Sequence, residues 1–341
     1  MKIRGIARLR RWTRQHQSKV VVLLYHRVFD ALSDPQLLCV SPRHFAEHLQ
    51  YLSAHYPILS LRELLLALRS RRLPKRAVTL TFDDGYADNL CNAKPLLGRY
   101  NAPATIFVTT ARMSQEREFW WDELERLLLL TRLLPSRFRI RIGDGMHEWH
   151  IGKWARLSEE EISECRTWNV ECRETPTPRH QMYLDLHTLL RGVGQMERER
   201  VLAILRAKIE SDRRPSCRTL LPHEISKLAD DELVEIGSHT VNHLVLSMQT
   251  LEVQQHELRE SRRQLEAVLG RPVTSISYPY GGQADVGQAM ELVQDAGYEV
   301  ACANLPAPVS RESDPLFLPR FLVRDWSSTE FAQHVRQFFN S

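Results

Sequence analysis

The stretch AVTLTFDDGY, residues 77–86, decides how the rest of the chain is interpreted. Its first six residues are apolar or β-favouring and include no breaker, which predicts a short buried strand of a parallel sheet. Asp83, Asp84 and Gly85 follow directly. Two neighbouring carboxylates at a strand end repel each other unless a cation or a shared proton relieves them. The same three residues also suit a plain turn, so this stretch alone leaves a functional site and a turn open.

A second short apolar run, VEIGS at residues 234–238, ends in His239-Thr-Val-Asn-His243. We interpret the two histidines as lying on one face of a helical turn, from which both imidazoles reach one metal ion. Imidazole and carboxylate ligands suit a divalent transition metal such as zinc. A further pair, His44 and His48, follows no strand end and is predicted to lie on the solvated face of a helix.

A third stretch, TSISYPYGG at residues 274–282, is again a predicted strand that ends in a Pro/Gly turn. With the other two it resembles the NodB-type polysaccharide deacetylases, which remove N-acetyl groups from sugars and carry the motifs TFDDG, H-[ST]-x-x-H and R-x-P-[YF]. Residues 81–85 and 239–243 match the first two motifs fully, and residues 277–280 match the third except for Ser277 in place of Arg. The recognisable matches cover about residues 20–110 and 220–325.

The resemblance implies a metal-dependent hydrolase and a role for each motif residue. Asp84, His239 and His243 are expected to hold a divalent metal ion, with zinc preferred, and Asp83 is expected to act as the general base. The backbone N–H of Tyr280 stands where the family stabilises the oxyanion of the tetrahedral intermediate.

The first predicted strand, residues 20–25, ends at His26. The family's catalytic acid is the histidine of a Leu-x-His motif, which some members carry at the N-terminus through circular permutation. Leu24-x-His26 fits that arrangement, so the resemblance implies that His26 protonates the leaving amine. A histidine that is hydrogen-bonded in a loop is the alternative.

The missing arginine of the third motif leaves the base Asp83 without a cation. The last predicted strand, residues 316–323, contains Arg320 among apolar residues, where an unpaired charge would be costly to bury. We therefore expect Arg320 to point into the barrel and pair with Asp83, with Arg324 as the second choice. A surface ion pair of Arg320 at the strand edge is the alternative.

Composition places the chain among ordinary globular proteins. It has 341 residues, 43% hydrophobic and 26% charged, and its net charge of +4 does not indicate a nucleic-acid binder. Six scattered cysteines favour a reducing compartment and no disulfide framework. Residues 1–19 are basic and loosely amphipathic; they predict a solvated terminus, or peripheral contact with an anionic membrane surface. Neither a signal peptide nor a transmembrane helix is predicted, so a cytoplasmic location is expected.

The order of predicted strands and helices indicates an α/β fold, namely a distorted, permuted (β/α)7-like barrel with an α-rich insertion. The barrel is expected over residues 20–111 and 220–341 and the insertion over 112–219, where five of the seven tryptophans lie. These rings either form the insertion's own core, which we favour, or stack on sugars.

The expected function is removal of N-acetyl groups from amino sugars of a cell-surface polysaccharide or its precursor. The alternatives are a glycan-binding scaffold without turnover, which Ser277 would suit, and a deacylase or deformylase of a lipid-linked amino sugar.

Overall fold

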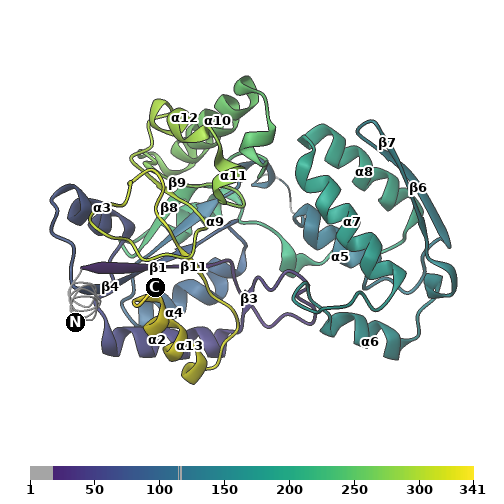
Figure 1. Ribbon diagram of the computed structural model, residues 1–341, viewed down its shortest axis with the longest axis horizontal. Coiled ribbons are helices and arrows are strands. Elements are labelled where there is room, and N and C mark those ends of the chain that lie inside the picture. The colour runs from purple at the N-terminus through teal and green to yellow at the C-terminus, as the bar shows by residue number, and fades with distance from the viewer. Residues whose placement is uncertain (1–17, 114, 116) are drawn as a thin grey trace, which may run out of the picture.

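The computed structural model describes residues 18–113, 115 and 117–341, and a parallel seven-stranded sheet forms its centre (Figure 1). The sheet order is β10-β9-β8-β5-β4-β1-β11. The strands are β1 (Lys19–Tyr25), β4 (Arg76–Phe82), β5 (Ala104–Val108), β8 (Val234–Ser238), β9 (Ser275–Ser277), β10 (Val300–Cys302) and β11 (Phe321–Leu322). All residues of β1 and β4 after the first are buried, as expected for apolar runs covered on both faces.

The segment before β11 connects the two edges of this sheet. Leu318 pairs with Cys302 of β10 at one edge, whereas β11 pairs with β1 at the other. The strand predicted over residues 316–323 is therefore two short pieces, because the chain crosses from one edge to the other. Arg320 stands at the crossing point. The sheet is thus curled into the expected distorted (β/α) barrel.

Helices surround the barrel, and their starts follow local capping signals. Ser41 caps α2, and Ser60 forms a capping box at the start of α3. The helices of this part are α2 (Pro42–His55), α3 (Leu61–Arg69), α4 (Lys94–Arg99), α9 (Pro222–Leu228), α10 (Leu251–Leu269), α11 (Gln283–Val286), α12 (Ala289–Asp295) and α13 (Ser328–Phe338). Two short strands, β2 (Arg27–Val28) and β3 (Cys39–Val40), pair beside the barrel. One apolar cluster links the sheet to these helices except α3, and a second cluster packs α3 against β1 and its neighbours.

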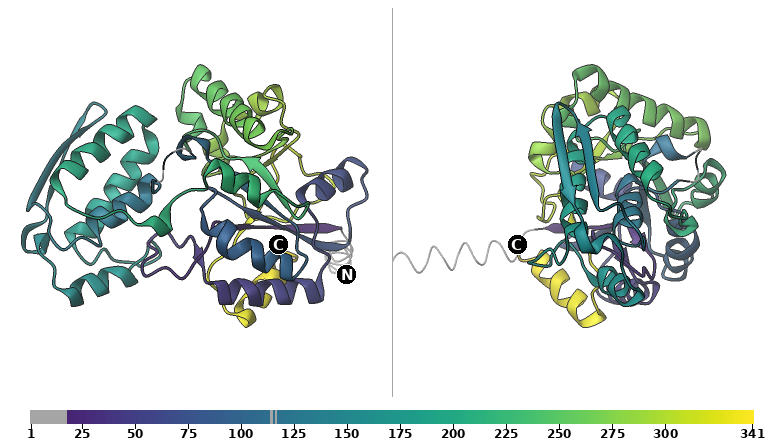
Figure 2. Two further views of the ribbon diagram at one scale, coloured as in Figure 1. Left: turned by 180° about the vertical axis from the view of Figure 1, so that it is seen from behind. Right: turned by 90° about the vertical axis from the view of Figure 1, so that its right-hand side faces the viewer.

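The segment after β5 builds a second lobe, seen from both sides in Figures 1 and 2. It contains α5 (Trp120–Leu128), the hairpin β6 (Arg137–Ile142) and β7 (Gly145–His150), and the helices α6 (Glu159–Thr167), α7 (Pro178–Gly192) and α8 (Gln195–Lys208). This lobe has an apolar cluster of its own, in which Trp120, Trp121, Trp149 and Trp168 are buried. We propose that residues 112–219 form a subdomain inserted between two barrel strands.

Two further local predictions were wrong. Residues 239–243 form a loop and not a helical turn, since Thr240 and His243 have φ angles of 64° and 53°. His48 is buried and not solvated: its ring stacks on Phe331 and its Nε2 lies 2.8 Å from the carbonyl oxygen of Trp326.

Residues 1–17, to which the predicted membrane-surface contact belongs, lie outside the described residues. None of the helices that the structure describes combines the length and the apolar composition that a bilayer-spanning helix needs.

Candidate active site

The carboxyl end of β4 turns sharply through two left-handed residues. Asp84 has a φ angle of 74° and Gly85 one of 76°. Asp84 is strained there, since a non-glycine residue rarely adopts this conformation. A Cβ atom on residue 85 would lie only 3.0 Å from the Val108 side chain, so the turn requires glycine. It leaves both Asp83 and Asp84 buried at the carboxyl edge of the sheet.

Asp84 meets the two histidines that follow β8. One ligand atom from each of Asp84, His239 and His243 lies within 4.8 Å of the other two. Asp84 Oδ1 lies 3.5 Å from Nε2 of each histidine. Ligands about 2.1 Å from one tetrahedral zinc ion lie about 3.4 Å apart, so the three side chains fit a shared divalent metal.

The hydrogen bond of His239 supports that fit. Its Nδ1 lies 2.7 Å from the carbonyl oxygen of Ser277. A carbonyl oxygen can only accept, so Nδ1 carries the proton and Nε2 presents its lone pair.

The loop between the two histidines is held by a buried acid from α10. Glu257 Oε2 accepts hydrogen bonds from the backbone N–H groups of Val241 and Asn242, and Oε1 accepts from the Asn242 side chain. These bonds offset the cost of the two left-handed residues of the loop.

Electrostatics at the three ligand groups also favours a cation. Burial, and then the charge of Asp83, raise the pKa of Asp84 well above its usual range. Burial, and then His239, lower the pKa of His243 well below its usual range. Both shifts disfavour the charged forms of these groups, and a divalent ion at the site would favour the ionised carboxylate and the neutral imidazoles that act as ligands.

Asp83, unlike Asp84, has a cationic neighbour, because Arg320 forms the predicted contact with it. Both carboxylate oxygens accept from the guanidinium at 2.8 Å, and both partners are almost fully buried. Ser277 joins the pair: its hydroxyl donates to Asp83 Oδ2 at 3.0 Å and accepts from Arg320 at 2.8 Å. Burial alone would raise the pKa of Asp83, but the charge and the hydrogen bonds of Arg320 outweigh it and hold the pKa well below its usual range.

The two remaining predicted residues lie near the same site. Burial lowers the pKa of His26 to about 4 although Asp83 raises it, and Arg320 and His239 also act on this ring. The Tyr280 ring centroid lies 4.8 Å from that of His243, and Tyr280 has a φ angle of 62°. Within the described residues its backbone N–H donates to no protein group. Arg324 forms no ion pair with Asp83 among the described residues and donates instead to the Gln36 and Leu37 carbonyls.

Sequence reasoning missed three residues of this neighbourhood. In the sequence, Ser277 stood out only because it replaces the family arginine. Its contact with Asp83 depends on the closed barrel. Glu257 could have been found from the helical pattern, since it falls on the buried face of α10 with Leu258 and Ser261. Trp121 of the insertion packs its ring 4.9 Å from the His243 ring, and no pattern in the sequence indicated which tryptophan would do so.

Fold and site together define an α/β barrel with a one-carboxylate, two-histidine centre beside an ionised aspartate. A family model described as polysaccharide deacetylase matches residues 70–129 and 196–301. The chain therefore belongs to the polysaccharide deacetylases of NodB type.

Several individual proteins are similar to this chain. YxkH of Bacillus subtilis strain 168, named for the same family, is 23% identical over 308 residues, covering 90% of this chain and 72% of that protein. Poly-β-1,6-N-acetyl-D-glucosamine N-deacetylase of Staphylococcus aureus is 29% identical over 113 residues, which is 29% of this chain and 39% of that enzyme.

Solved structures show the same fold. The deacetylase PplD of Streptococcus pyogenes superposes with a TM-score of 0.56 at 19% identity, covering 93% of this chain and 98% of PplD. IcaB of Ammonifex degensii superposes with a TM-score of 0.52 at 17% identity, covering 95% and 98% of the two chains.

Proposed function

We propose that this protein hydrolyses the N-acetyl amide of amino-sugar units in a cell-surface polysaccharide or its precursor, with a divalent metal ion, zinc being preferred, at Asp84, His239 and His243. The observation that carries the proposal is the position of these three ligands beside the Asp83–Arg320 pair. The staphylococcal relative, which acts on an N-acetylglucosamine polymer, supports the choice of substrate class.

Asp83 is the proposed general base. The bound metal would lower the pKa of a coordinated water and polarise the amide carbonyl. Arg320 and Ser277 fix the Asp83 carboxylate in its ionised form, so it is ready to accept the water's proton.

Tyr280 and His26 are proposed to act on the two sides of the amide. The free backbone N–H of Tyr280 would stabilise the oxyanion. His26 would protonate the leaving amine. Because its pKa of about 4 leaves the resting ring neutral at pH 7, the proton must reach His26 during the reaction. Asp83, which interacts with His26, is the group that has just accepted one.

The alternative of a glycan-binding scaffold rested on Ser277 in place of the family arginine. Arg320 supplies a guanidinium to Asp83 from the segment just before β11, so the serine at position 277 does not leave the base without a cation. The alternative of a lipid-linked substrate rested on residues 1–19, most of which lie outside the described residues.

The test combines metal analysis with acetate release from a panel of N-acetylated oligosaccharides. Wild type is expected to bind about one divalent ion per chain and to release acetate. Asp83→Asn should keep the ion and lose turnover by about 10²-fold or more, the usual scale for a positioned general base. A wild-type protein that binds a glycan tightly and releases no acetate from any of the panel would establish the scaffold instead.

A further inference from the structure

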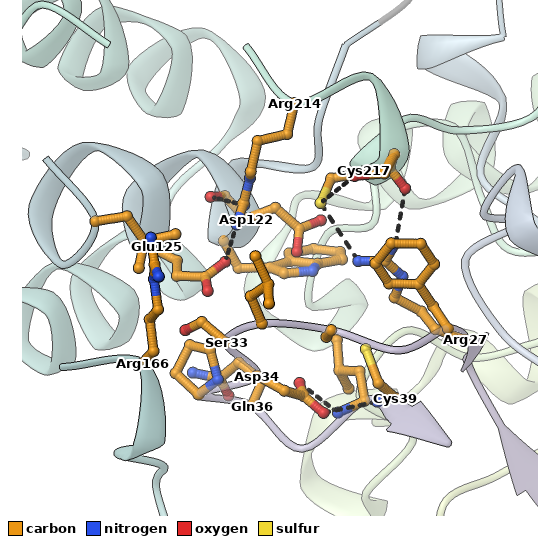
Figure 3. Close-up of a pocket in the computed structure, with 18 of the residues that line it drawn as sticks. Arg27, Ser33, Asp34, Gln36, Cys39, Asp122, Glu125, Arg166, Arg214 and Cys217 are labelled. Carbon is orange, nitrogen blue, oxygen red and sulfur yellow. Dashed lines mark hydrogen bonds and ion pairs between the residues drawn. The ribbon is translucent and has the colours of Figure 1, made fainter. Parts of the chain in front are cut away.

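A cavity of about 400 Å³ lies beside the candidate active site, within the range of about 300–1,000 Å³ that is usual for small-molecule sites (Figure 3). On one side the cavity is lined by Arg27 and by the loop of residues 29–39 that joins β2 to β3. The other side is formed by residues of the proposed insertion, namely those of α5, Arg166 of α6, Tyr183 of α7 and the segment 214–217. The cavity therefore lies where the two lobes meet.

Trp121 is a wall that the cavity shares with the metal-ligand cluster. It lines the cavity, and its ring packs against that of His243 on the other side. Its indole N–H donates to the Tyr86 hydroxyl at 2.8 Å, and that hydroxyl donates to Asp122 Oδ2 at 2.8 Å. Asp122 also lines the cavity. A ligand in the cavity would lie about one indole ring away from the metal site.

The cavity wall holds carboxylates that lack cationic partners. Among the described residues neither Asp34 nor Asp122 forms an ion pair. The carboxylate of Asp34 accepts from the backbone N–H groups of Leu38 and Cys39. Asp122 is more than nine-tenths buried, and its Oδ1 accepts no hydrogen bond from the described residues.

Two of the three arginines of the cavity wall, Arg27 and Arg214, are engaged by acids. Arg27 pairs with Asp88 at 2.9 Å, outside the cavity lining. Arg214 donates to Glu118 at 2.7 Å and to Glu125 at 2.8 Å. Burial raises the pKa of Asp122 to about 7 despite both arginines, and it also raises the pKa values of Asp34 and Glu125. The third arginine, Arg166, is exposed on α6 and forms no ion pair among the described residues. Two carboxylates without an ion pair, Asp34 and Asp122, thus face one such arginine, and a cationic ligand would be stabilised beside them.

We propose that this cavity is a subsite for a glucosamine unit with a free ammonium group, adjoining the acetylated unit at the metal site. The ammonium and hydroxyl groups of such a unit are donors that match the free acceptors of Asp122 and Asp34. The apolar faces of the sugar ring match the aromatic side chains of Trp121 and Phe29 in the lining. The inference rests on the proposed function, because a glucosamine unit is what that reaction leaves behind. It follows that the protein acts preferentially next to units that are already deacetylated.

The test uses probes without acetyl groups, so that binding is measured independently of turnover. Full-length protein is titrated calorimetrically with a glucosamine trisaccharide and with a glucose trisaccharide of the same linkage, at a pH where the amine is protonated. Wild type should bind the glucosamine trisaccharide at least about tenfold more tightly, the effect of one charge-assisted contact. Asp122→Asn should reduce this preference to about twofold or less. Glu160→Gln, an exposed acid of α6 outside the cavity lining, should keep it.

A second variant guards against misfolding of Asp122→Asn, and thermal unfolding checks the fold of both. Ala31→Trp fills the cavity from the loop of residues 29–39 and should weaken binding of the glucosamine trisaccharide at least about tenfold. Equal binding of the two trisaccharides to wild type, or a preference that survives in both variants, would overturn the subsite. Acetate release measured in parallel separates the two proposals. Release without a glucosamine preference removes the subsite alone, and a preference without release removes the proposed deacetylation alone.

Discussion

At the scale of the residue, two adjacent aspartates differ because of their neighbours and not their sequence. Asp83 faces a buried guanidinium and stays ionised, whereas Asp84 faces two imidazoles and lacks a cation. One environment suits a proton acceptor and the other a metal ligand. Pairs of carboxyl groups whose surroundings drive their pKa values apart are a common basis for different roles in catalysis.

Replacing either histidine should abolish metal binding. His239→Ala and His243→Ala each leave two of the three proposed ligands, too few for a stable site. Metal analysis of the purified variants should find less than about one tenth of the wild-type content. His55→Ala, an exposed histidine at the end of α2, is the matched control and should retain the ion. Full metal content in both site variants would be incompatible with the assignment.

Arg320→Met should harm both turnover and stability. The variant leaves the buried Asp83 carboxylate with Ser277 as its nearest donor, and breaking a buried pair costs about 3–5 kcal/mol. Acetate release should fall about 10²-fold because the base is no longer held ionised and oriented. Arg320→Lys restores the charge without the bidentate contact. It should recover part of the unfolding free energy that Arg320→Met loses. Unchanged turnover in Arg320→Met would refute a positioning role.

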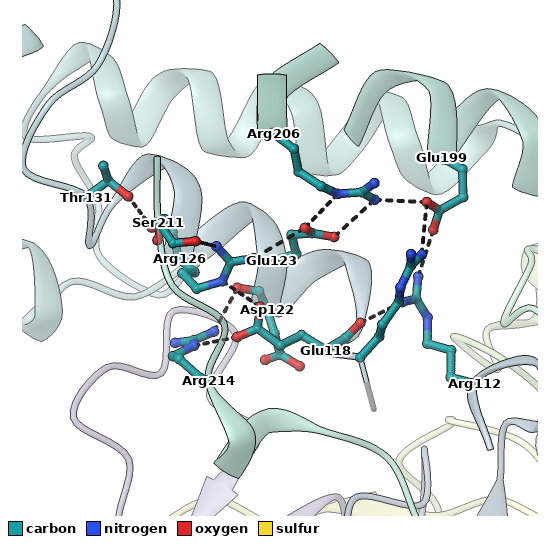
Figure 4. Close-up of polar contacts among 11 residues, drawn as sticks. Arg112, Glu118, Asp122, Glu123, Arg126, Thr131, Glu199, Arg206, Ser211 and Arg214 are labelled. Carbon is teal, nitrogen blue, oxygen red and sulfur yellow. Dashed lines mark hydrogen bonds and ion pairs between the residues drawn. The ribbon is translucent and has the colours of Figure 1, made fainter. Parts of the chain in front are cut away.

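At the scale of the element, a buried ion network ties the start of the insertion to its helices (Figure 4). Glu118 lies just before α5 and accepts from Arg126 at 2.6 Å and from Arg214 at 2.7 Å. Glu123 joins Arg126 to Arg206 of α8. Several charged groups that share partners hold a fixed geometry better than isolated pairs do. The network thus positions α5, which carries Trp121 and Asp122.

Glu118→Gln should destabilise the protein by about 3 kcal/mol, because it leaves two largely buried guanidinium groups with less countercharge. Chemical denaturation measures the loss. The control is Glu148→Gln on the β7 strand, whose pairs with Arg137 and Arg139 are exposed and should contribute less than about 1 kcal/mol. If the two substitutions lower the unfolding free energy by the same amount, the buried network stabilises the protein no more than the exposed pairs do.

At the scale of the whole molecule, three histidines make stability depend on pH, two of them buried and the third, His187, half-buried. Burial lowers the pKa values of His48, His180 and His187 to about 4. The unfolded chain has histidine pKa values of about 6.5, so it binds more protons than the folded chain between pH 4 and 6.5. The contribution is therefore fully present above pH 6.5 and is lost as the pH falls towards 4, by up to about 3 kcal/mol for each histidine.

Denaturant unfolding between pH 4 and 7 checks this expectation. The unfolding free energy of wild type should decrease on acidification across that window. His48→Gln, whose amide can still bond to the Trp326 carbonyl but does not titrate, should show a shallower decrease. His55→Gln, the exposed neighbour on α2, should follow wild type. Identical slopes for all three proteins would exclude His48 as a source of the pH dependence.

The sequence by itself determined the features whose signals are local. The apolar run before Asp83 predicts β4, since a buried parallel strand needs little besides β-favouring apolar residues. The serines at positions 41 and 60 predict the starts of α2 and α3, because a capping hydrogen bond spans only three residues. The motifs at the ends of β4 and β8 indicated which side chains meet, as the carboxyl ends of parallel strands share one edge.

Only the tertiary structure decided how those side chains are held. Arg320 was inferred from the cost of burying a charge, but its contact with Asp83, 237 positions away, required the crossing segment that closes the barrel. The loop from His239 to His243 is not a helical turn because Glu257 of another element binds its backbone. The cavity beside Trp121 exists because the insertion packs against the loop after β2. Each is a contact between segments far apart in the chain, and such contacts follow from how the elements pack rather than from any local pattern.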